Sequence, residues 1–258
     1  MYAIRVSLVH VIRARKTKQR SFGGFAAWPG PDAARPAVTR EQVVRRALEV
    51  LNDEGFDGLT MRRLAERLGI KAASLYNHVS DKHELLALMA DAICAEIPGL
   101  DHSKPWREQA EAMALEVRRV LMAHRDGARV LAATLPVGPH RLRLIEQVLH
   151  ALVSAGFSPE KTTDASFVMN SYVVGFVLDE TLGSPRDTAS AKRVREEGRR
   201  WFKSLPKERY PTLVSLADEL IDAPADRRFA LGLRALLDGL ELRLSKKGTR
   251  SAAPVDPV

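Results

Sequence analysis

Residues 62–85, RRLAERLGIKAASLYNHVSDKHEL, contain the stretch that decides the fold. Gly69 divides it into two short segments, and both have the apolar spacing typical of a helix. Thr60 is a candidate N-cap for a first helix over Met61–Leu68, which a left-handed Gly69 would close. A second helix is expected from about Ala72 to Val79. Two short helices joined by a glycine-containing turn form a helix-turn-helix.

Longer helices are expected on both sides of this motif. The preceding one begins at Thr39, with Gln42 in capping-box spacing, presents apolar residues on one face and ends at Gly55. The following one begins at Asp81 as the N-cap and continues to about Pro98. A complete apolar face on the first long helix gives the two short helices a surface on which to pack.

The second short helix has an apolar side and an outward side. Leu75 and Val79 are placed to hold it against its neighbours, so its N-terminal residues are free to reach the major groove of DNA. Alanine side chains let the backbone approach base edges closely, and donor side chains suit phosphate contacts that fix register. The candidate DNA-contacting residues are Lys71, Ala72, Ala73, Ser74, Tyr76, Asn77, His78 and Lys82.

Spacing alone leaves a second interpretation open for two of these residues. Tyr76 and His78 could be half-buried packing residues on an ordinary helical hairpin, because helical hairpins are common and short motifs have false positives. In that case the motif would be structural.

Composition limits the class of protein. The formal net charge is +8, and residues 1–37 contribute 7 − 1 = +6 of it, which predicts a flexible basic arm or an upstream-extended start. An arm of this charge could attract phosphates without specificity. An organellar presequence is a weaker alternative for the same residues. Cys94 is the single cysteine, which excludes an intrachain disulfide and fits a packing role in a reducing cytoplasm. No apolar run approaches the length of a membrane span, so no membrane partner is expected.

The remainder of the chain has an almost entirely helical pattern. Its breaks are short segments rich in proline and glycine, Ser158 with Pro159 is a strong helix start, and no sustained two-residue alternation predicts a sheet. We therefore expect an all-α protein in which a three-helix helix-turn-helix domain precedes a larger antiparallel helical bundle. The expected divisions are a basic extension at 1–37, the DNA-binding domain at 38–84, an effector-binding and dimerisation domain at 85–246, and a flexible tail at 247–258.

The run LTMRRLAERLGIKAASLYNHVSDKHELL resembles the DNA-binding motif of the tetracycline-repressor (TetR) family over about residues 39–86. The resemblance implies that Arg62 reads or approaches DNA and that residues 72–78 belong to the recognition helix. Asn77 stands where the tetracycline repressors carry Trp, so the operator sequence does not follow from the resemblance. The signature positions are Leu75, Tyr76, His78, Asp81 and Lys82.

The resemblance extends more weakly into the second domain, through HRDGARVLAATLP at residues 124–136. Leu131 occupies the position of the histidine that ligates the magnesium of the drug in the tetracycline repressor, and Leu135 replaces an arginine. Thr134 and Pro136 are retained. Because a leucine side chain cannot coordinate a hard cation, we do not expect magnesium-tetracycline as the effector.

Catalysis and metal binding are not expected. His-Arg-Asp also occurs in protein-kinase catalytic loops, but the chain has no glycine-rich loop and no Asp-Phe-Gly. We interpret Asp126 as a helix N-cap, with Gly127 easing a tight junction. The histidines show no recognised metal-ligand spacing, and no cofactor is predicted.

A regulator of this type implies a ligand cavity and a dimer interface in the larger domain. Apolar residues at helical spacing are also the usual constituents of a core, so the assignments are hypotheses. The expected effector-binding residues are Met113, Val117, Leu131, Thr134, Leu135, Pro136, Leu149, Phe167 and Met169. The expected dimer-interface residues are Tyr172, Phe176, Phe229, Leu233, Leu236, Leu237 and Leu240.

The leading functional hypothesis is therefore a dimeric transcriptional repressor that a largely apolar small molecule releases from a near-palindromic operator. The alternative is an all-helical small-molecule-binding protein, or an enzyme, that retains the helix-turn-helix for structure. A steep dependence of duplex binding on salt would separate the two, because only neutralisation of phosphates produces it.

Overall fold

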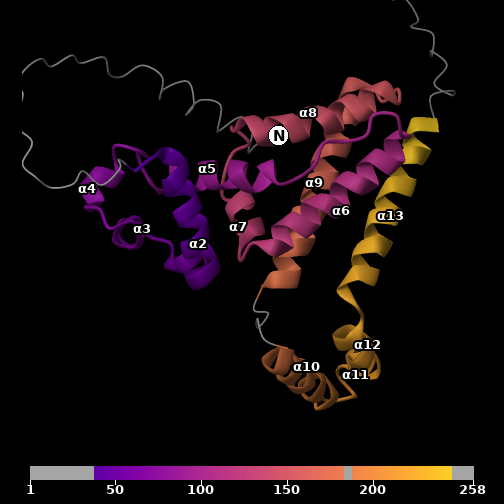
Figure 1. Cartoon of the computed structure of the whole chain (residues 1–258). Coiled ribbons are helices and arrows are strands. Elements are labelled where there is room, and N and C mark those ends of the chain that lie inside the picture. Colours follow the sequence, from indigo (N-terminus) through magenta and orange to yellow (C-terminus); the bar gives the residue numbers. More distant parts are fainter. Residues whose placement is uncertain (1–37, 183–187, 246–258) are drawn as a thin grey trace, which may run out of the picture.

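The computed structural model describes residues 38–182 and 188–245, and every regular element in these ranges is an α-helix (Figure 1). The predicted all-α class is confirmed. The basic extension at 1–37 and the tail at 247–258 lie outside the described residues. No helix within the described ranges is long and apolar enough to span a membrane.

The first long helix, α2 (Arg40–Gly58), begins as predicted. Thr39 and Gln42 form the complete capping box, each side chain bonding to the backbone N–H of the other. The regular helix is interrupted at Gly55, whose φ of 78° only glycine adopts readily, and one further turn follows. The predicted end at Gly55 is therefore a kink, and the bent segment after it carries Phe56 and Asp57 towards the second domain.

The two short helices follow as α3 (Met61–Leu68) and α4 (Ala72–Leu75). Thr60 caps α3, and Gly69 ends it with a left-handed φ of 68°, as the sequence predicts. The predicted extension of the second helix to Val79 is wrong, because α4 ends at Leu75 and residues 76–78 form turns. This early end lets the chain reverse direction before the next helix begins.

A buried cluster holds the helix-turn-helix together. Leu64, Leu75 and Val79 are inaccessible or nearly so, and they belong to one core with residues of α2 such as Val43 and Val50. Each buried aliphatic side chain of this kind contributes about 1.5–3 kcal/mol. The position of α4 is therefore set by packing within the chain.

Helix α5 (Lys82–Ala95) connects this domain to the second one. Asp81 caps it by accepting from the backbone N–H of Glu84, and Glu84 in turn pairs with Arg40 of α2. Its apolar residues lie within the same core cluster as the helix-turn-helix and parts of the second domain. The helix ends at Ala95, earlier than predicted, and a tight turn leads to Pro98.

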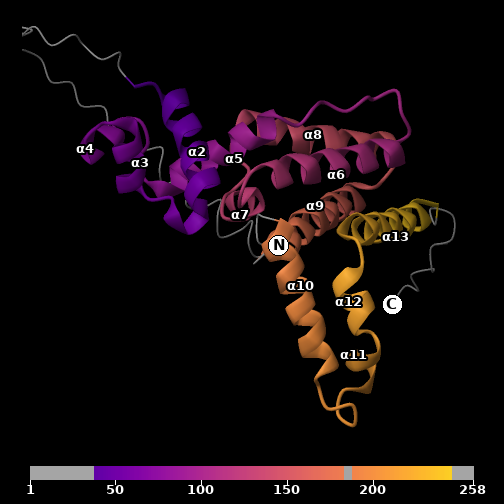
Figure 2. The ribbon, with the colours of Figure 1, turned by 60° about the horizontal axis from the view of Figure 1, so that its bottom comes forward.

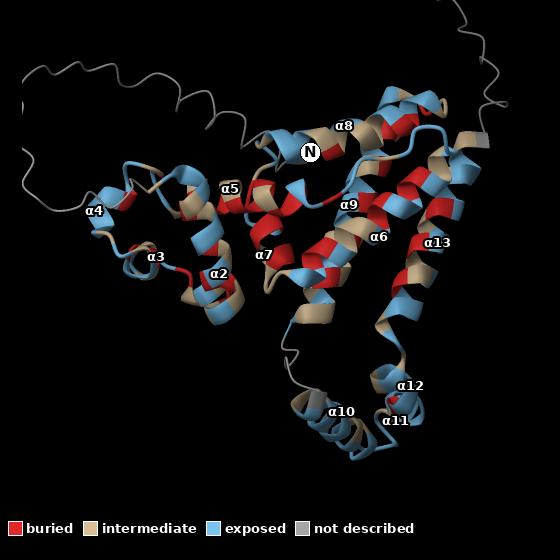
Figure 3. Ribbon diagram, in the orientation of Figure 1, coloured by how far each residue is buried: buried red, intermediate tan, exposed pale blue. Residues whose placement is uncertain are grey.

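The second domain consists of packed helices around α6, with a separate projecting arm. In Figure 3 buried residues are concentrated on α5 and α7, which pack against each other and against α6. Ser158 caps α9 and Pro159 opens it, as predicted. The packed helices are α6 (Trp106–Ala123), α7 (Gly127–Ala132), α8 (Pro139–Ser154), α9 (Pro159–Thr181) and α13 (Ala225–Ser245).

The arm consists of α10 (Thr188–Lys203), α11 (Pro211–Ser215) and α12 (Ala217–Asp222) and points away from the other helices (Figure 2). Ion pairs hold the arm together, because Arg199 and Lys203 of α10 contact Asp218 at 3.2 and 2.8 Å. The sequence pattern identified these segments as helical but gave no sign that they leave the bundle.

Candidate DNA-binding surface, cavities and dimer face

The outward side of α3 and α4 exposes the predicted DNA-contacting residues. Tyr76 is 52% exposed, and the residues from Lys71 to Ser74 are also exposed, as is Asn77. His78 and Lys82 are half-buried. The packing interpretation therefore does not describe Tyr76, although it stays open for His78. DNA contact by this surface stays a prediction.

Arginines on α3 divide into two groups by their partners. The side chain of Arg62 points outward and pairs only with Glu66 at 3.1 Å in the described structure. Arg63 donates to both carboxylate oxygens of Glu54 at 2.7 and 2.9 Å, and Arg67 bonds to Glu54 at 2.9 Å. The bonds from Arg67 and Arg63 lower the pKa of Glu54. Arg63 and Arg67 thus tie α3 to α2, and Arg62 is the one oriented towards solvent.

The turn between α6 and α7 contacts the DNA-binding domain through Asp126. The carboxylate of Asp126 accepts a 2.7 Å bond from the backbone N–H of Phe56. Asp126 occupies the N-cap position of α7 but makes no capping bond, and its φ is 55°. Asp126 therefore stands at the predicted N-cap position, but the prediction that its side chain caps α7 is wrong. The side chain satisfies a donor in the other domain instead.

Two arginines of the same segment reinforce this contact. The backbone N–H of Arg125 donates to Asn52 at 3.0 Å, and its guanidinium donates to the carbonyl of Asp53 at 2.7 Å. Arg129 forms a bidentate pair with Asp57 at 3.0 and 3.1 Å, and this pairing lowers the pKa of Asp57. We call residues 124–129 the junction turn, because they connect the two domains by hydrogen bonds.

Phe56 lies at the centre of the junction. The guanidinium of Arg129 lies 4.5 Å from its ring centroid, and the ammonium of Lys82 lies 5.2 Å from it. Both are within the range of cation–π attraction. Lys82 is also a predicted phosphate contact at the start of α5, so one aromatic ring lies beside the α2 kink, α7 and the start of α5.

A half-buried arginine that sequence reasoning missed fixes the end of α7. Arg141 donates to the hydroxyl of Thr134 at 2.8 Å and to the carbonyl of Leu131 at 3.0 Å. Burial lowers the pKa of Arg141. Two expected effector residues therefore have a guanidinium beside them, where the sequence alone had predicted an apolar wall.

Arg141 is positioned in turn by Asp91 of α5. One carboxylate oxygen of Asp91 accepts from the backbone N–H of Arg141, and the other bonds to His140, both at 2.9 Å. A Cβ at Gly138 would meet the Asp91 carboxyl at 2.1 Å, so only glycine fits there. Asp91 thus caps the N-terminus of α8 from another helix. A short-range sequence pattern has no signal for such a cap.

The expected effector residues are only partly brought together, because Met113 and Leu131 belong to one core cluster with Val117 packed against it. Met113, Leu131 and Thr134 are buried, Val117, Leu135 and Leu149 are half-buried, and Pro136 is exposed. Met169 belongs to a core cluster with residues of α13. Phe167 is 62% exposed and lines neither of the two cavities described below, so its assignment to a pocket stays a prediction.

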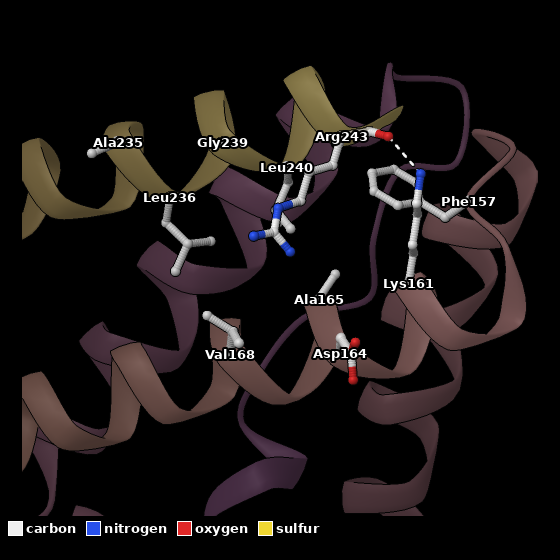
Figure 4. A pocket seen from close by; sticks show the side chains of 10 residues that line it. All are labelled: Phe157, Lys161, Asp164, Ala165, Val168, Ala235, Leu236, Gly239, Leu240 and Arg243. Carbon is white, nitrogen blue, oxygen red and sulfur yellow. Dashed lines mark hydrogen bonds between the residues drawn. The ribbon is translucent and has the colours of Figure 1, made fainter. Parts of the chain in front are cut away.

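The described part of the second domain contains a groove on α9 and α13 and a cavity beside α6. The first, which we call the α9–α13 groove, has a volume of about 260 Å³ (Figure 4). Figure 4 shows Val168 and Leu236 projecting into it from the two helices, with Lys161 bonded to the carbonyl of Arg243. The second, the α6 cavity, has a volume of about 200 Å³ and lies between residues 98–104 and α6. Of the expected effector residues, Met113 lines the α6 cavity, and none lines the groove.

The stripe expected to form the dimer interface faces inward. Phe229, Leu233 and Leu237 are at most 2% exposed and pack with Met169 and Val173 of α9. Within this contact the hydroxyl of Tyr172 donates to the carbonyl of Phe229 at 2.7 Å. The prediction that these residues form the interface is therefore wrong for the buried members. Half-buried Tyr172, Phe176, Leu236 and Leu240 pack on the same cluster.

The same two helices also carry apolar side chains outside this buried cluster. Four large apolar side chains there are exposed, Leu231 by 71%. Gly175 and Gly239 face open space, with no atom within 4 Å of a built Cβ. We call this surface the outer face of α9 and α13, and its apolar residues are Phe167, Val168, Leu231 and Leu242.

In the part of the chain that the structure describes, no group of three or more His, Cys, Asp or Glu residues could hold a metal ion. Leu131, in particular, offers no donor atom.

Comparisons with known proteins cover both domains. The model "Bacterial regulatory proteins, tetR family" matches residues 43–89, and the model "Tetracyclin repressor-like, C-terminal domain" matches residues 98–244. The tetracycline repressor protein class C of Escherichia coli is 35% identical over 225 residues, which cover 85% of this chain and 98% of that protein.

Solved structures with the same fold include ligand and DNA complexes. ActR of Streptomyces coelicolor with actinorhodin superposes with a TM-score of 0.70 at 33% identity, covering 81% of this chain and 99% of that one. A structure of BioQ with its double-stranded DNA operator gives a TM-score of 0.58 at 28% identity, covering 79% of this chain and 98% of that one.

Proposed function

Because the chain belongs to the tetR family of bacterial regulatory proteins, we propose that it is a sequence-specific DNA-binding repressor that a small molecule releases from its operator. Its relatives are named as repressors, and the structure of BioQ contains a DNA operator. The proposal divides the chain into a DNA-binding domain at 38–84 and an effector-binding and dimerisation domain at 85–246.

The way in which α4 is packed against the rest of its domain is the main support for DNA binding. Leu75 and Val79 are buried against α2, whereas Lys71, Ser74 and Tyr76 project outward from the same short segment. Side chains on a rigid element are positioned to read a groove, and α5 leads directly from this segment into the second domain. We propose that Arg62, Ala72, Ala73, Asn77, His78 and Lys82 complete the DNA-contacting surface.

A homodimer would supply the second recognition helix. We place its interface on the outer face of α9 and α13, because the exposed apolar residues and the two open glycines would allow close packing of four helices. The α9–α13 groove lies on these helices, and a second copy would cover part of it. A two-fold dimer requires a near-palindromic operator with half-sites about one helical turn, or roughly 34 Å, apart.

The effector proposed for this chain differs from magnesium-tetracycline. Leu131 cannot ligate a metal, and the guanidinium of Arg141 beside it would repel a metal cation. The structure of ActR contains actinorhodin, which supports a small molecule as the effector here. We place the effector in the α6 cavity, next to Met113.

The junction turn supports a route from the effector to the DNA. Helix α7 carries Leu131 at one end and Arg129 near the other, and Asp126 bonds to Phe56 of the DNA-binding domain. A ligand that favours a different position of α7 would change these bonds and so the orientation of α2 and α4. The loss of operator affinity would equal the difference in ligand affinity between the two conformations.

We propose that the chain is not an enzyme, since its relatives are named as regulators, and that it acts in the cytoplasm, where the DNA of a bacterium lies. The competing function, a binding protein with a structural helix-turn-helix, would leave the exposed residues of α4 without a role.

Selection from a random duplex library tests the proposal. Purified full-length protein should enrich one near-palindrome, and its affinity should fall steeply as salt rises from 50 to 200 mM, by about 1,000-fold or more for six phosphate contacts. A scrambled duplex of the same composition is the control. Folded protein that enriches no sequence would contradict the repressor function and favour the binding-protein interpretation.

A further inference from the structure

The α6 cavity has a chemical character that nothing above assigns, and it bears on the class of effector. The connection between α5 and α6 forms one wall, with Pro98 and Leu100, and α6 forms the other, with Ala112 and Met113. These four residues make an apolar surface. Its volume of about 200 Å³ suits a small ligand that leaves part of itself in solvent.

The charged groups that line the cavity are mostly acidic. Asp101, Glu108 and Glu116 oppose Lys104, which gives 1 − 3 = −2 in a chain with a net charge of +8. A lining with this charge favours cations over anions from the first encounter.

Two of these carboxylates have hydrogen-bond or ion-pair partners close by. Asp101 accepts from the hydroxyl and the backbone N–H of Ser103 at 2.6 and 3.0 Å, and these bonds lower its pKa. Glu116 pairs with Arg119, one turn along α6, at 2.8 Å. Within residues 38–182 and 188–245, Glu108 has no ion-pair partner. Glu108 is therefore the carboxylate most available to a ligand.

The buried amide of the cavity does not provide a free donor. Gln109 donates from Nε2 to the carbonyl of Lys104 at 2.7 Å, and its Oε1 lies 3.1 Å from Nδ1 of His102. The lining thus offers carboxylate acceptors above an apolar surface, with Lys104 as its exposed cationic donor. A ligand that carries its own N–H donors would satisfy these acceptors.

The α9–α13 groove has the opposite character. Lys161 and Arg243 oppose Asp164 there, which gives 2 − 1 = +1. Figure 4 shows the Arg243 guanidinium lying over the apolar part of the groove. An anionic ligand would favour the groove, and a cationic ligand would favour the α6 cavity.

We infer that the effector is an organic cation, a protonated amine on an apolar body, bound in the α6 cavity with its nitrogen at Glu108 and its apolar part on Met113, while Glu116 adds to the negative charge of the lining. That the bound amine acts as an effector rests on the proposed function, whereas its binding in the α6 cavity does not depend on that function.

Matched ligand triplets test this inference with full-length protein. Octylamine, phenethylamine and tryptamine would each be compared with the alcohol and the carboxylate on the same carbon skeleton, by isothermal titration calorimetry at pH 7. At least one amine should bind tenfold or more tightly than its alcohol, and each carboxylate should bind most weakly of its triplet. If no amine binds more tightly than its alcohol, the inference is wrong.

Charge-neutralising variants locate the site. Glu108→Gln with Glu116→Gln should weaken the best amine about tenfold while leaving the matched alcohol unchanged, and Asp164→Asn in the groove is the control. Equal amine affinity in the double variant and the parent would overturn the assignment to this cavity. Unchanged melting temperatures would show that both variants fold.

Operator binding, measured on the same samples, separates the two proposals. An amine that binds and weakens operator affinity supports both of them. An amine that binds to a protein with no operator preference contradicts the repressor function and leaves the cation site standing. A protein that binds its operator but shows no preference for the amine supports the repressor function and contradicts the cation site.

Discussion

The short helices α3 and α4 each have one apolar face, which is buried within the chain, whereas α9 and α13 have two apolar faces and bury only one. Leu75 is inaccessible and its neighbour Tyr76 projects into solvent. On α13, Phe229 is inaccessible, yet Leu231 is also apolar and exposed. The first domain therefore buries its apolar face within one chain and exposes a polar surface, whereas the second leaves apolar side chains of α9 and α13 exposed, where we propose that a second copy binds.

The largest effect is expected from removing a buried side chain of the first domain. Leu75→Ala should destabilise the helix-turn-helix by about 2–5 kcal/mol, because it loses burial and leaves a cavity under α4. Denaturant unfolding and hydrogen exchange of residues 60–80 would measure it, and operator binding should be lost. Leu142→Ala, at an exposed position on α8, is the control and should change stability by less than about 0.5 kcal/mol. Similar losses in both variants would contradict the packing described for α4.

Substitutions on the outer face of α9 and α13 should weaken dimerisation without destabilising the folded chain. Phe167→Glu with Leu231→Glu should leave the folded monomer intact but place like charges in the dimer interface, raising the dimer dissociation constant by about 100-fold or more. Sedimentation at several concentrations would measure it, and operator affinity should fall with the dimer. Leu142→Glu controls for adding charge to an exposed leucine. A variant that still dimerises like the parent would place the interface elsewhere.

The exposed side of the helix-turn-helix should affect DNA binding without affecting stability. Tyr76→Ala and Arg62→Ala should each weaken operator binding by about 1–3 kcal/mol, the range of a good base or charged contact. Tm and dimer mass should remain those of the parent. Lys207→Ala, which removes one positive charge from the exposed arm, is the control for net charge. If Lys207→Ala weakens binding as much, the effect is electrostatic and α4 does not dock as proposed.

The accuracy of the sequence predictions follows the same division between regions. Caps at Thr39, Thr60, Gly69, Asp81 and Ser158 were predicted correctly, because a cap is a contact between residues close in sequence. The length of α4 was overestimated, since the turn at residues 76–78 is set by where α5 must begin.

The sequence could not predict contacts between segments that are distant along the chain. Asp91 caps α8 from α5, Asp126 bonds to the α2 kink, and Arg141 binds the end of α7, and none of these pairs has a short-range pattern. The prediction of the dimer-interface residues on α13 was wrong for a different reason. Periodicity finds apolar positions on α13, but it does not say which of two apolar sides the same chain buries.

The smallest effect, and the one that links the two regions, is expected at the junction turn. Asp126→Asn keeps a side chain that tolerates the left-handed φ of 55° and can still accept from Phe56, but it replaces a charged acceptor by a neutral one. The variant should lose about 1 kcal/mol in the coupling between the domains, since bonds to charged groups exceed neutral ones by about that amount. The measured quantity is the ratio of operator affinities with and without effector.

That ratio should change about fivefold in Asp126→Asn, in keeping with a coupling change of about 1 kcal/mol. Effector-free operator affinity and effector affinity for the isolated protein should change less. Glu111→Gln, which removes one exposed carboxylate from α6 away from the junction, is the control. An unchanged ratio would show that the bond to Phe56 does not carry the signal. Coupling would then pass through α5, whose Asp91 ties it to α8, and the junction turn would only hold the two domains together.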